Sequence, residues 1–158
     1  MTSMLVPVDE AGIPALHAML LALAESDGVA DVRTTPDALR EALAGATPLV
    51  HAHFIEHAGQ VAGFTLHSWK WGTFTGTRDL YLNALYVGPG HRRAGVARAA
   101  LAELARLALA QGGSRIEWLT VRAKTGTAAF YDAIGSTAAD HMAVRRLHGD
   151  ALRALASA

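Results

Sequence analysis

The sequence predicts an α/β fold, a mixed sheet with helices on both faces, and three features support this prediction. Strand-like segments alternate with segments of helical periodicity along the 158 residues. Residues 80–87 (Leu-Tyr-Leu-Asn-Ala-Leu-Tyr-Val) are apolar and aromatic enough for a central strand. A glycine-rich turn then leads into residues 96–111, the clearest helical pattern in the chain. No linker rich in Pro, Gly or Ser interrupts the sequence, so we expect a single domain over residues 1–158.

The chain before the central strand is expected to hold strands and helices in the order β-α-α-β-β. They are a strand over residues 4–8, helices over 12–25 and 35–45, and strands over 50–56 and 61–71. Thr35, Pro36 and Asp37 mark the start of the second helix, because they supply an N-cap, a proline at the first position and an early acid. Residues 57–60 (His-Ala-Gly-Gln) are short enough for a hairpin connection.

The elements after the central strand begin with the long helix. Its predicted core face consists of Val96, Ala100, Leu101, Leu104 and Ala108. The elements that follow are a strand over residues 115–121, a short helix over 127–133, a strand over 142–147 and an Ala/Leu-rich helix over 150–156. The expected order of the sheet and its helices is therefore β-α-α-β-β-β-α-β-α-β, with a C-terminal helix after it.

Composition excludes several classes of protein. The chain has no cysteine, which excludes disulfides, a thiolate nucleophile and a cysteine metal site. Hydrophobic residues make up 51% and charged residues 18%, which favours a packed core over disorder. No apolar run approaches the roughly 18 residues of a membrane-spanning helix, and the start lacks the pattern of a signal peptide. We expect a cytoplasmic protein with no membrane partner.

Charge is divided unevenly along the chain. Residues 1–90 hold four basic and nine acidic residues, whereas residues 91–158 hold ten basic and five acidic residues. A basic back half suits a polyanionic ligand and an acidic front half suits a cationic one, although scattered surface charge would give the same counts. The net charge is zero and no basic stripe carries aromatic residues, so we expect no nucleic-acid partner.

A stretch of small and basic residues, 88–97 (Gly-Pro-Gly-His-Arg-Arg-Ala-Gly-Val-Ala), joins the central strand to the long helix. The first N–H groups of a helix lack partners within it and are usually capped by Ser, Thr, Asp or Asn. None of these residues lies between Val87 and Val96. The free N–H groups, the helix dipole and the neighbouring arginines predict an anion site. The alternative is an ordinary tight turn with solvated arginines.

Two motifs carry a family resemblance. Residues 92–97 (Arg-Arg-Ala-Gly-Val-Ala) fit the pattern Q/R-x-x-G-x-G/A, and residues 127–135 (Thr-Ala-Ala-Phe-Tyr-Asp-Ala-Ile-Gly) resemble A-x-x-F-Y-x-x-x-G. These are motifs A and B of the GNAT superfamily of N-acetyltransferases. Nearly the whole chain resembles the diamine (spermidine/spermine) and thialysine N-acetyltransferase branch, most closely over residues 80–135. The resemblance implies a mixed, mostly antiparallel sheet and transfer of acetyl from acetyl-CoA to a primary amine, without a metal.

The resemblance also implies roles for individual residues. The backbone at the end of the central strand would hold the pantetheine arm, the turn would hold the pyrophosphate, and motif B would flank the rest of the coenzyme. The coenzyme-binding residues would be Leu85, Tyr86, Val87, Arg92, Arg93, Ala94, Gly95, Val96, Ala97, Arg98, Lys124 and Thr127. Tyr131 matches the motif B tyrosine that protonates the departing thiolate. An isolated Phe-Tyr pair on a short helix would otherwise indicate simple packing.

The sequence departs from the branch near the acceptor. Asn83 and Ala84 replace an acidic pair, and Arg122 and Lys124 add positive charge, which argues against a polyamine and for a neutral or anionic acceptor. The expected acceptor contacts are Asp27, Asn83, Glu117 and Trp118. Because Asn83 is no useful base, proton removal is left to Asp27, Glu25, His67 or Glu117, or to a relay of water and backbone carbonyls.

Other features leave alternatives open. His51, His53 and His57 alternate along one strand, as metal ligands can, but ordinary packing or solvent exposure is the expectation. The aromatic segment 69–74 is either a substrate lid or a contact with a second subunit, and a homodimer is implied by resemblance. The loss of the acidic pair leaves a non-catalytic acyl-CoA sensor as the alternative to an active enzyme.

Overall fold

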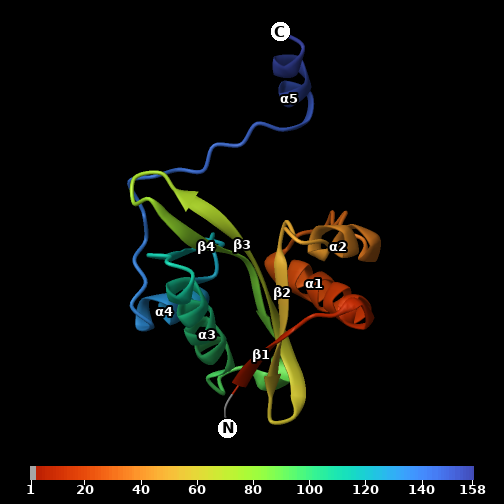
Figure 1. Ribbon diagram of the computed structural model, residues 1–158, viewed down its shortest axis with the longest axis vertical. Helices are drawn as coiled ribbons and strands as arrows, with labels where there is room; N and C mark the ends of the chain where they lie inside the picture. The colour runs from red at the N-terminus through yellow and green to blue at the C-terminus, as the bar shows by residue number, and fades with distance from the viewer. Residues whose placement is uncertain (1–2) are drawn as a thin grey trace. The chain divides into compact units, whose positions relative to one another are not determined.

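The computed structural model describes residues 3–158, which divide into two compact units, the first ending at Val121 and the second spanning Arg122–Ala158. The first unit is built on a sheet of five strands in the order β1-β2-β3-β4-β5. The strands are β1 (Ser3–Pro7), β2 (His51–His57), β3 (Gln60–Gly72), β4 (Thr77–Val87) and β5 (Ile116–Glu117). Neighbours from β1 to β4 are antiparallel and β5 is parallel to β4. The predicted mixed, mostly antiparallel sheet is therefore confirmed (Figure 1).

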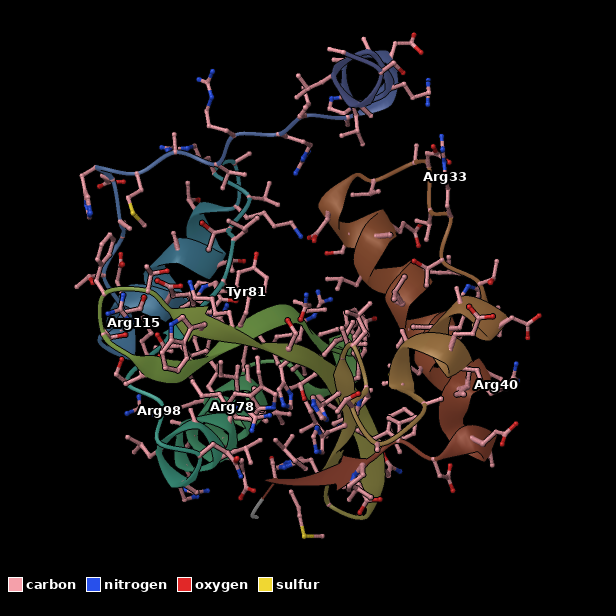
Figure 2. All side chains as sticks on the ribbon, turned by 45° about the horizontal axis from the view of Figure 1, so that its top comes forward. Arg33, Arg40, Arg78, Tyr81, Arg98 and Arg115 are labelled. Atoms are coloured by element: carbon pink, nitrogen blue, oxygen red, sulfur yellow. The ribbon has the colours of Figure 1, made fainter. Side chains whose placement is uncertain are left out.

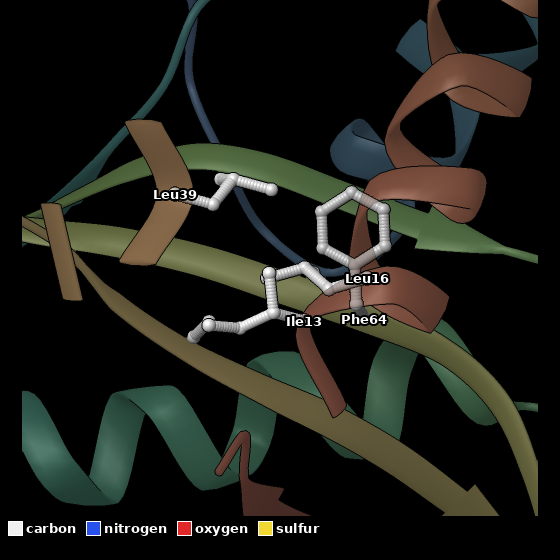
Figure 3. Packing of buried hydrophobic residues seen from close by; sticks show 5 residues of the cluster. Ile13, Leu16, Leu39 and Phe64 are labelled. Atoms are coloured by element: carbon white, nitrogen blue, oxygen red, sulfur yellow. The ribbon is translucent and has the colours of Figure 1, made fainter. Parts of the chain in front are cut away.

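One face of the sheet is covered by α1 (Ile13–Asp27) and α2 (Pro36–Leu43), which follow a short 3-10 turn, η1 (Glu10–Gly12). Ile13 and Leu16 of α1 and Leu39 of α2 form a buried cluster with Phe64 of β3 (Figure 3). Phe54 of β2 packs against the same cluster. Aliphatic burial against an aromatic side chain thus fixes both helices on this face of the sheet.

The other face is covered by α3 (Val96–Ala110). Ile55, the neighbour of Phe54 in β2, packs with Val96 and Ala100 of this helix. Because successive strand residues point to opposite faces, α3 lies on the face opposite α1 and α2. The five residues predicted to face the core from this helix are all buried, which confirms the periodicity argument.

The local signals at the start of α2 act as predicted. Thr35 Oγ1 accepts a hydrogen bond from the Ala38 N–H at 3.1 Å, and Pro36 is the first helical residue. The hairpin between β2 and β3 turns through Ala58 and Gly59, which both have positive φ angles. No helix within residues 3–158 is long and apolar enough to cross a membrane.

The second unit contains α4 (Thr125–Ala133) and α5 (Gly149–Ala156), where short helices were predicted. The strand predicted over residues 142–147 is wrong, because this segment has no regular structure. Met142 and Val144 supply the alternating pattern but are 62% and 64% exposed. Alternation alone does not make a strand stable, since a strand also needs a paired neighbour and a buried face.

The strand predicted over residues 115–121 is also shorter than expected, because β5 is limited to Ile116–Glu117. The partner strand explains this result. Leu66 pairs with Ala84 while His67 pairs with Leu82, so Asn83 is an extra, bulged residue in β4. A bulge bends its strand, and β4 and β5 separate just before this one.

Candidate active site

Strand β4 changes its surroundings halfway along its length. Its first half is paired on both sides, because Leu80 and Tyr81 are in register with Ile116 and Glu117 of β5. From Asn83 onward, the described part of the chain provides no strand on the β5 side. The later half of β4 therefore has one open edge, where backbone N–H and C=O groups can bind an extended ligand.

The residues predicted to hold the pantetheine arm, Leu85, Tyr86 and Val87, form this open half. Their partly buried side chains pack against the core clusters: Tyr86 on the α1 side, and Leu85 and Val87 on the α3 side. Their backbone N–H and C=O groups on the open side remain available to a ligand. Gly63 pairs opposite Val87, and a Cβ at Gly63 would lie 2.0 Å from the Tyr86 carbonyl oxygen. That glycine therefore allows β3 to support the open half closely.

The turn after β4 runs through a short 3-10 segment, η2 (Pro89–His91), to the start of α3. Arg92 Nε donates a hydrogen bond to the Val87 carbonyl at 2.9 Å, which ties the turn to the end of the strand. Arg93 and Gly95 have left-handed φ angles of 61° and 77°, and Ala94 between them does not. Backbone that alternates in handedness in this way can direct successive N–H groups toward one anion.

The first turn of α3 is uncapped. Its N-cap is Gly95, and no side chain of the described residues caps it. The N–H groups of Val96, Ala97 and Arg98 therefore have no acceptor within the helix. A Cβ placed on Gly95 would meet nothing within 4 Å, so there is open space beside this N-cap. Open space, free N–H groups and the exposed arginines at 93 and 98 fit a pyrophosphate.

A polar patch lies beside the bulge on the face that α1 and α2 share. Ser68 Oγ donates to Asn83 Oδ1 at 3.0 Å, and Lys70 Nζ forms an ion pair with Glu117. Tyr81 is in register with both Ser68 and Glu117, and cross-strand partners point to the same face. We name this group the acceptor patch: Ser68, Lys70, Tyr81, Asn83 and Glu117. It unites the predicted contacts Asn83 and Glu117, and Trp118 follows directly, half-buried.

Asp79, a fully buried carboxylate of β4, is in register with Lys70 of the acceptor patch. Asp79 Oδ1 accepts hydrogen bonds from the Ser114 N–H at 2.9 Å and from Thr77 Oγ1 at 2.8 Å. The Ser114 N–H, with the Thr77 hydroxyl and the Arg115 guanidinium, holds the pKa of Asp79 below its usual value. This charge fixes the segment leading into β5 against β4. In Figure 2, Tyr81 and Arg78 lie on opposite sides of β4, with α3 on the Arg78 side.

Asp27, the remaining predicted acceptor contact, lies at the C-terminal end of α1. It lines a shallow pocket of about 300 Å³ together with Leu20, Leu23 and the loop after the helix. Leu20 and Leu23, like Ala84 of β4, also pack against the buried cluster around Phe64. Glu25 is exposed and does not line it.

His67, another candidate base, lies on the opposite face from the acceptor patch. Its ring stacks with those of His51 and His53, with ring centroids 5.1 Å and 5.5 Å away. Burial, with the two neighbouring imidazoles, lowers the pKa of His67 to about 4. His57, by contrast, forms a hydrogen bond with Ser3 Oγ at 2.9 Å. Within residues 3–158, no three His, Asp or Glu side chains are grouped to hold a metal ion.

The second unit holds the motif B residues. Lys124 is the N-cap of α4, and its carbonyl accepts the Thr127 N–H at 3.1 Å. Tyr131 is half-buried near the end of this helix, with its ring centroid 5.3 Å from that of Phe130. The Ser136 N–H donates to the Tyr131 carbonyl, and Gly135 takes a φ of 90° to end the helix. Arg122 is exposed before the helix.

Sequence reasoning missed Lys70, Ser68 and Arg115 as members or neighbours of the site. Lys70 and Glu117 are 47 residues apart and sit on strands that are not neighbours in the sheet. The available signal was alternation, since Ser68 and Lys70, like Arg115 and Glu117, are two positions apart on predicted strands. Alternation does not show which strand lies between them.

Comparisons with known proteins point to one family. Residues 17–135 match the Acetyltransferase (GNAT) family. Thialysine N-epsilon-acetyltransferase of Bos taurus is 30% identical over 146 residues, which cover 85% of this chain and 85% of that protein. L-ornithine N5-acetyltransferase NATA1 of Arabidopsis thaliana is 28% identical over 95 residues, which are 60% of this chain but only 42% of the plant protein.

Solved structures share the fold. An integron cassette protein from the mobile metagenome of V. cholerae superposes with a TM-score of 0.81 at 18% identity, over 100% of this chain and 99% of that chain. A ribosomal-protein-alanine N-acetyltransferase from Brucella melitensis biovar Abortus 2308 gives a TM-score of 0.72 at 19% identity, over 92% and 99%. At these identities the likeness concerns the fold alone.

Proposed function

This chain belongs to the GNAT acetyltransferase family and is an N-acetyltransferase, and we propose that it moves acetyl from acetyl-CoA to a primary amine. The observation that carries the proposal is the order in which three structural features follow one another from β4 to α3. A strand with one open edge leads through a left-handed turn into an uncapped helix start. Such an arrangement can bind an extended thioester arm and its pyrophosphate in a continuous path.

In this proposal the backbone of Leu85, Tyr86 and Val87 binds the pantetheine arm, and the turn from Arg92 to Arg98 binds the pyrophosphate. Lys124 and Thr127 flank the remainder of the coenzyme. The thioester supplies the acetyl group. Asn83 and Trp118 contact the acceptor. The names of two relatives of this chain give thialysine and L-ornithine as their substrates. Both are amino acids with a side-chain amine, which supports a small-molecule acceptor.

The chemistry needs an amine without its extra proton and a donor for the departing thiolate. The amine nitrogen bonds to the acyl carbon while the carbon–sulfur bond breaks. The thiolate takes the phenolic proton of Tyr131, and the proton of the amine goes to Asp27, to Glu117 or to water. We also propose that residues 1–158 work as one domain and form a homodimer in the cytoplasm. The family match, which continues across the boundary at Val121 and Arg122, supports the single domain.

The first test is calorimetric titration with acetyl-CoA and CoA, followed by an amine panel scored for free-thiol release. We expect micromolar binding of both and release with at least one amine. Binding without release on any amine would favour a non-catalytic acyl-CoA sensor, an alternative motivated by Asn83 and Ala84 in place of acids. Absence of binding would refute the assignment of the turn.

Tyr131→Phe tests the proton donor. Because the phenolic proton is needed mainly in the transition state, we expect kcat to fall roughly 100-fold while the Kd of acetyl-CoA changes less than about twofold. Steady-state kinetics and calorimetry measure the two quantities. Unchanged kcat would remove Tyr131 from the mechanism, and a parallel loss of affinity would assign it to binding.

A further inference from the structure

An ionic bridge crosses β4 at the point where β4 and β5 separate. Lys70 on β3 forms an ion pair with Glu117 on β5, and β4 lies between the two strands. Arg115 joins the bridge, because its Nη1 is 3.7 Å from Glu117 Oε1 and its Nε is 3.4 Å from Asp79 Oδ2. Lys70 and Arg115 therefore both approach the accessible carboxylate of Glu117. Lys70 and Glu117 belong to the acceptor patch, and Arg115 lies at its edge.

The members of this bridge differ in how firmly they are held. Asp79 is fully buried and accepts hydrogen bonds from Ser114 and Thr77, so it serves as an anchor. The side chains of Lys70, Arg115 and Glu117 remain 42%, 47% and 30% exposed. An exposed ion pair contributes little to stability, because water competes with it. A charged ligand can therefore take the place of either partner at small cost.

The arrangement of charges selects the kind of ligand. The two cations present a surface for a carboxylate, and Glu117 presents one for an ammonium group. An α-amino acid carries both groups on a single carbon. A diamine brings the same ammonium group without a carboxylate, so the like charges of Lys70 and Arg115 would oppose its approach with nothing to offset them.

We propose that Lys70, Arg115 and Glu117 bind the zwitterionic head group of an amino-acid acceptor and so determine its specificity. The carboxylate binds Lys70 and Arg115, and the α-ammonium binds Glu117, which leaves Asp27 or water to take the proton from the reacting amine. This inference rests on the proposed acetyl transfer at the open half of β4. The head-group site and the open half of β4 lie along the same strand, so the reacting amine belongs to the acceptor's side chain rather than to its head group.

The test uses two matched pairs of acceptors, L-lysine with cadaverine and L-ornithine with putrescine, which differ only in the carboxylate. For wild type we expect kcat/KM to favour the amino acid by at least about tenfold in one pair. Lys70→Gln should reduce this preference to about twofold or less through a higher KM for the amino acid. Lys70→Arg should restore most of it, since the cation is retained.

The control is Arg106→Gln, which removes an exposed ion pair of α3 with Glu103, whose N–O distance is 2.9 Å. It should leave the preference unchanged. Equal kcat/KM within both pairs for wild type, or a preference that survives Lys70→Gln, would overturn the head-group assignment while leaving acetyl transfer intact.

Calorimetric binding of L-lysine and cadaverine to the protein alone and to its CoA complex gives a second readout that needs no turnover. Tighter binding of L-lysine, lost in Lys70→Gln, supports the head-group site even if no amine is acetylated. No turnover with any amine would count against the proposed function. Absence of L-lysine binding to either form would count against the head-group site.

Discussion

At the start of α2, Thr35 Oγ1 accepts the Ala38 N–H at 3.1 Å, whereas at the start of α3 the same position is Gly95, which has no side chain to offer. The residue before α2 is in extended backbone, and the residue before α3 is left-handed, with a φ of 77°. Pro36 opens α2, while no proline opens α3. The first turn of α2 therefore has a side-chain acceptor for one of its unpaired N–H groups, whereas the first turn of α3 has none among the described residues.

The difference separates a structural helix start from one kept open for a ligand. A side-chain cap contributes about 1 kcal/mol, and α2 has this contribution while α3 does not. The N–H groups of α3 keep their capacity for an external acceptor, and the exposed guanidinium groups of Arg93 and Arg98 lie in or beside the same turn. The helix with the missing cap is the one that follows the open half of β4.

The largest effect is expected for Gly95→Glu. A carboxylate in front of the free N–H groups would cap the helix and repel the pyrophosphate, so the Kd of CoA should rise at least about 100-fold. The left-handed backbone adds roughly 1–2 kcal/mol of strain. Calorimetry measures the affinity, and urea unfolding measures the stability.

Gly112→Glu is the matched control, because Gly112 has a φ of 76°, open space around it and a place at the other end of α3. It should lose similar stability and keep CoA binding. Retained binding in Gly95→Glu, or an equal loss in Gly112→Glu, would contradict the assignment of the anion site to the start of α3.

An intermediate effect is expected for Arg93→Gly, in which stability and affinity should move in opposite directions. Arg93 has a φ of 61°, which glycine adopts without strain, so the free energy of unfolding should rise by about 0.5–1 kcal/mol. Loss of the guanidinium should weaken CoA binding roughly tenfold. Ala58→Gly, at the other non-glycine residue with positive φ within residues 3–158, should give the same stabilisation without loss of affinity. Unchanged affinity in Arg93→Gly would remove Arg93 from the site.

The features that the sequence predicts well are those whose cause is local. The Thr35 cap, the hairpin turn after His57 and the buried face of α3 depend on residues within a few positions of one another. The uncapped turn before Val96 is visible for the same reason, because a cap is missing from a short stretch of chain. Asn83 and Glu117 were singled out by resemblance, and the structure brings them into the same patch.

The features that escaped prediction depend on strand register and pairing. Asn83 is a bulge only because Leu66 and His67 pair with Ala84 and Leu82, and β5 ends early where the partner strand bends. The bridge from Lys70 to Glu117 requires knowing that β4 lies between them. The wrong strand at 142–147 has the reverse cause: its pattern was suitable, but no partner strand is paired with it among the described residues.

The smallest effect is expected for Thr35→Ala, which should make the start of α2 resemble that of α3 without providing a ligand. Loss of the Oγ1 acceptor should lower the free energy of unfolding by about 1 kcal/mol, and Thr35→Ser should restore most of it. The Kd of CoA should stay within about twofold of wild type, so CoA at 100 times the wild-type Kd should stabilise both proteins by about 2.7 kcal/mol. Urea unfolding with and without CoA measures this difference. A smaller stabilisation by CoA in Thr35→Ala would mean that the α2 cap also contributes to coenzyme binding. The start of α2 could then no longer be assigned a purely structural role, in contrast to the ligand-binding role of the start of α3.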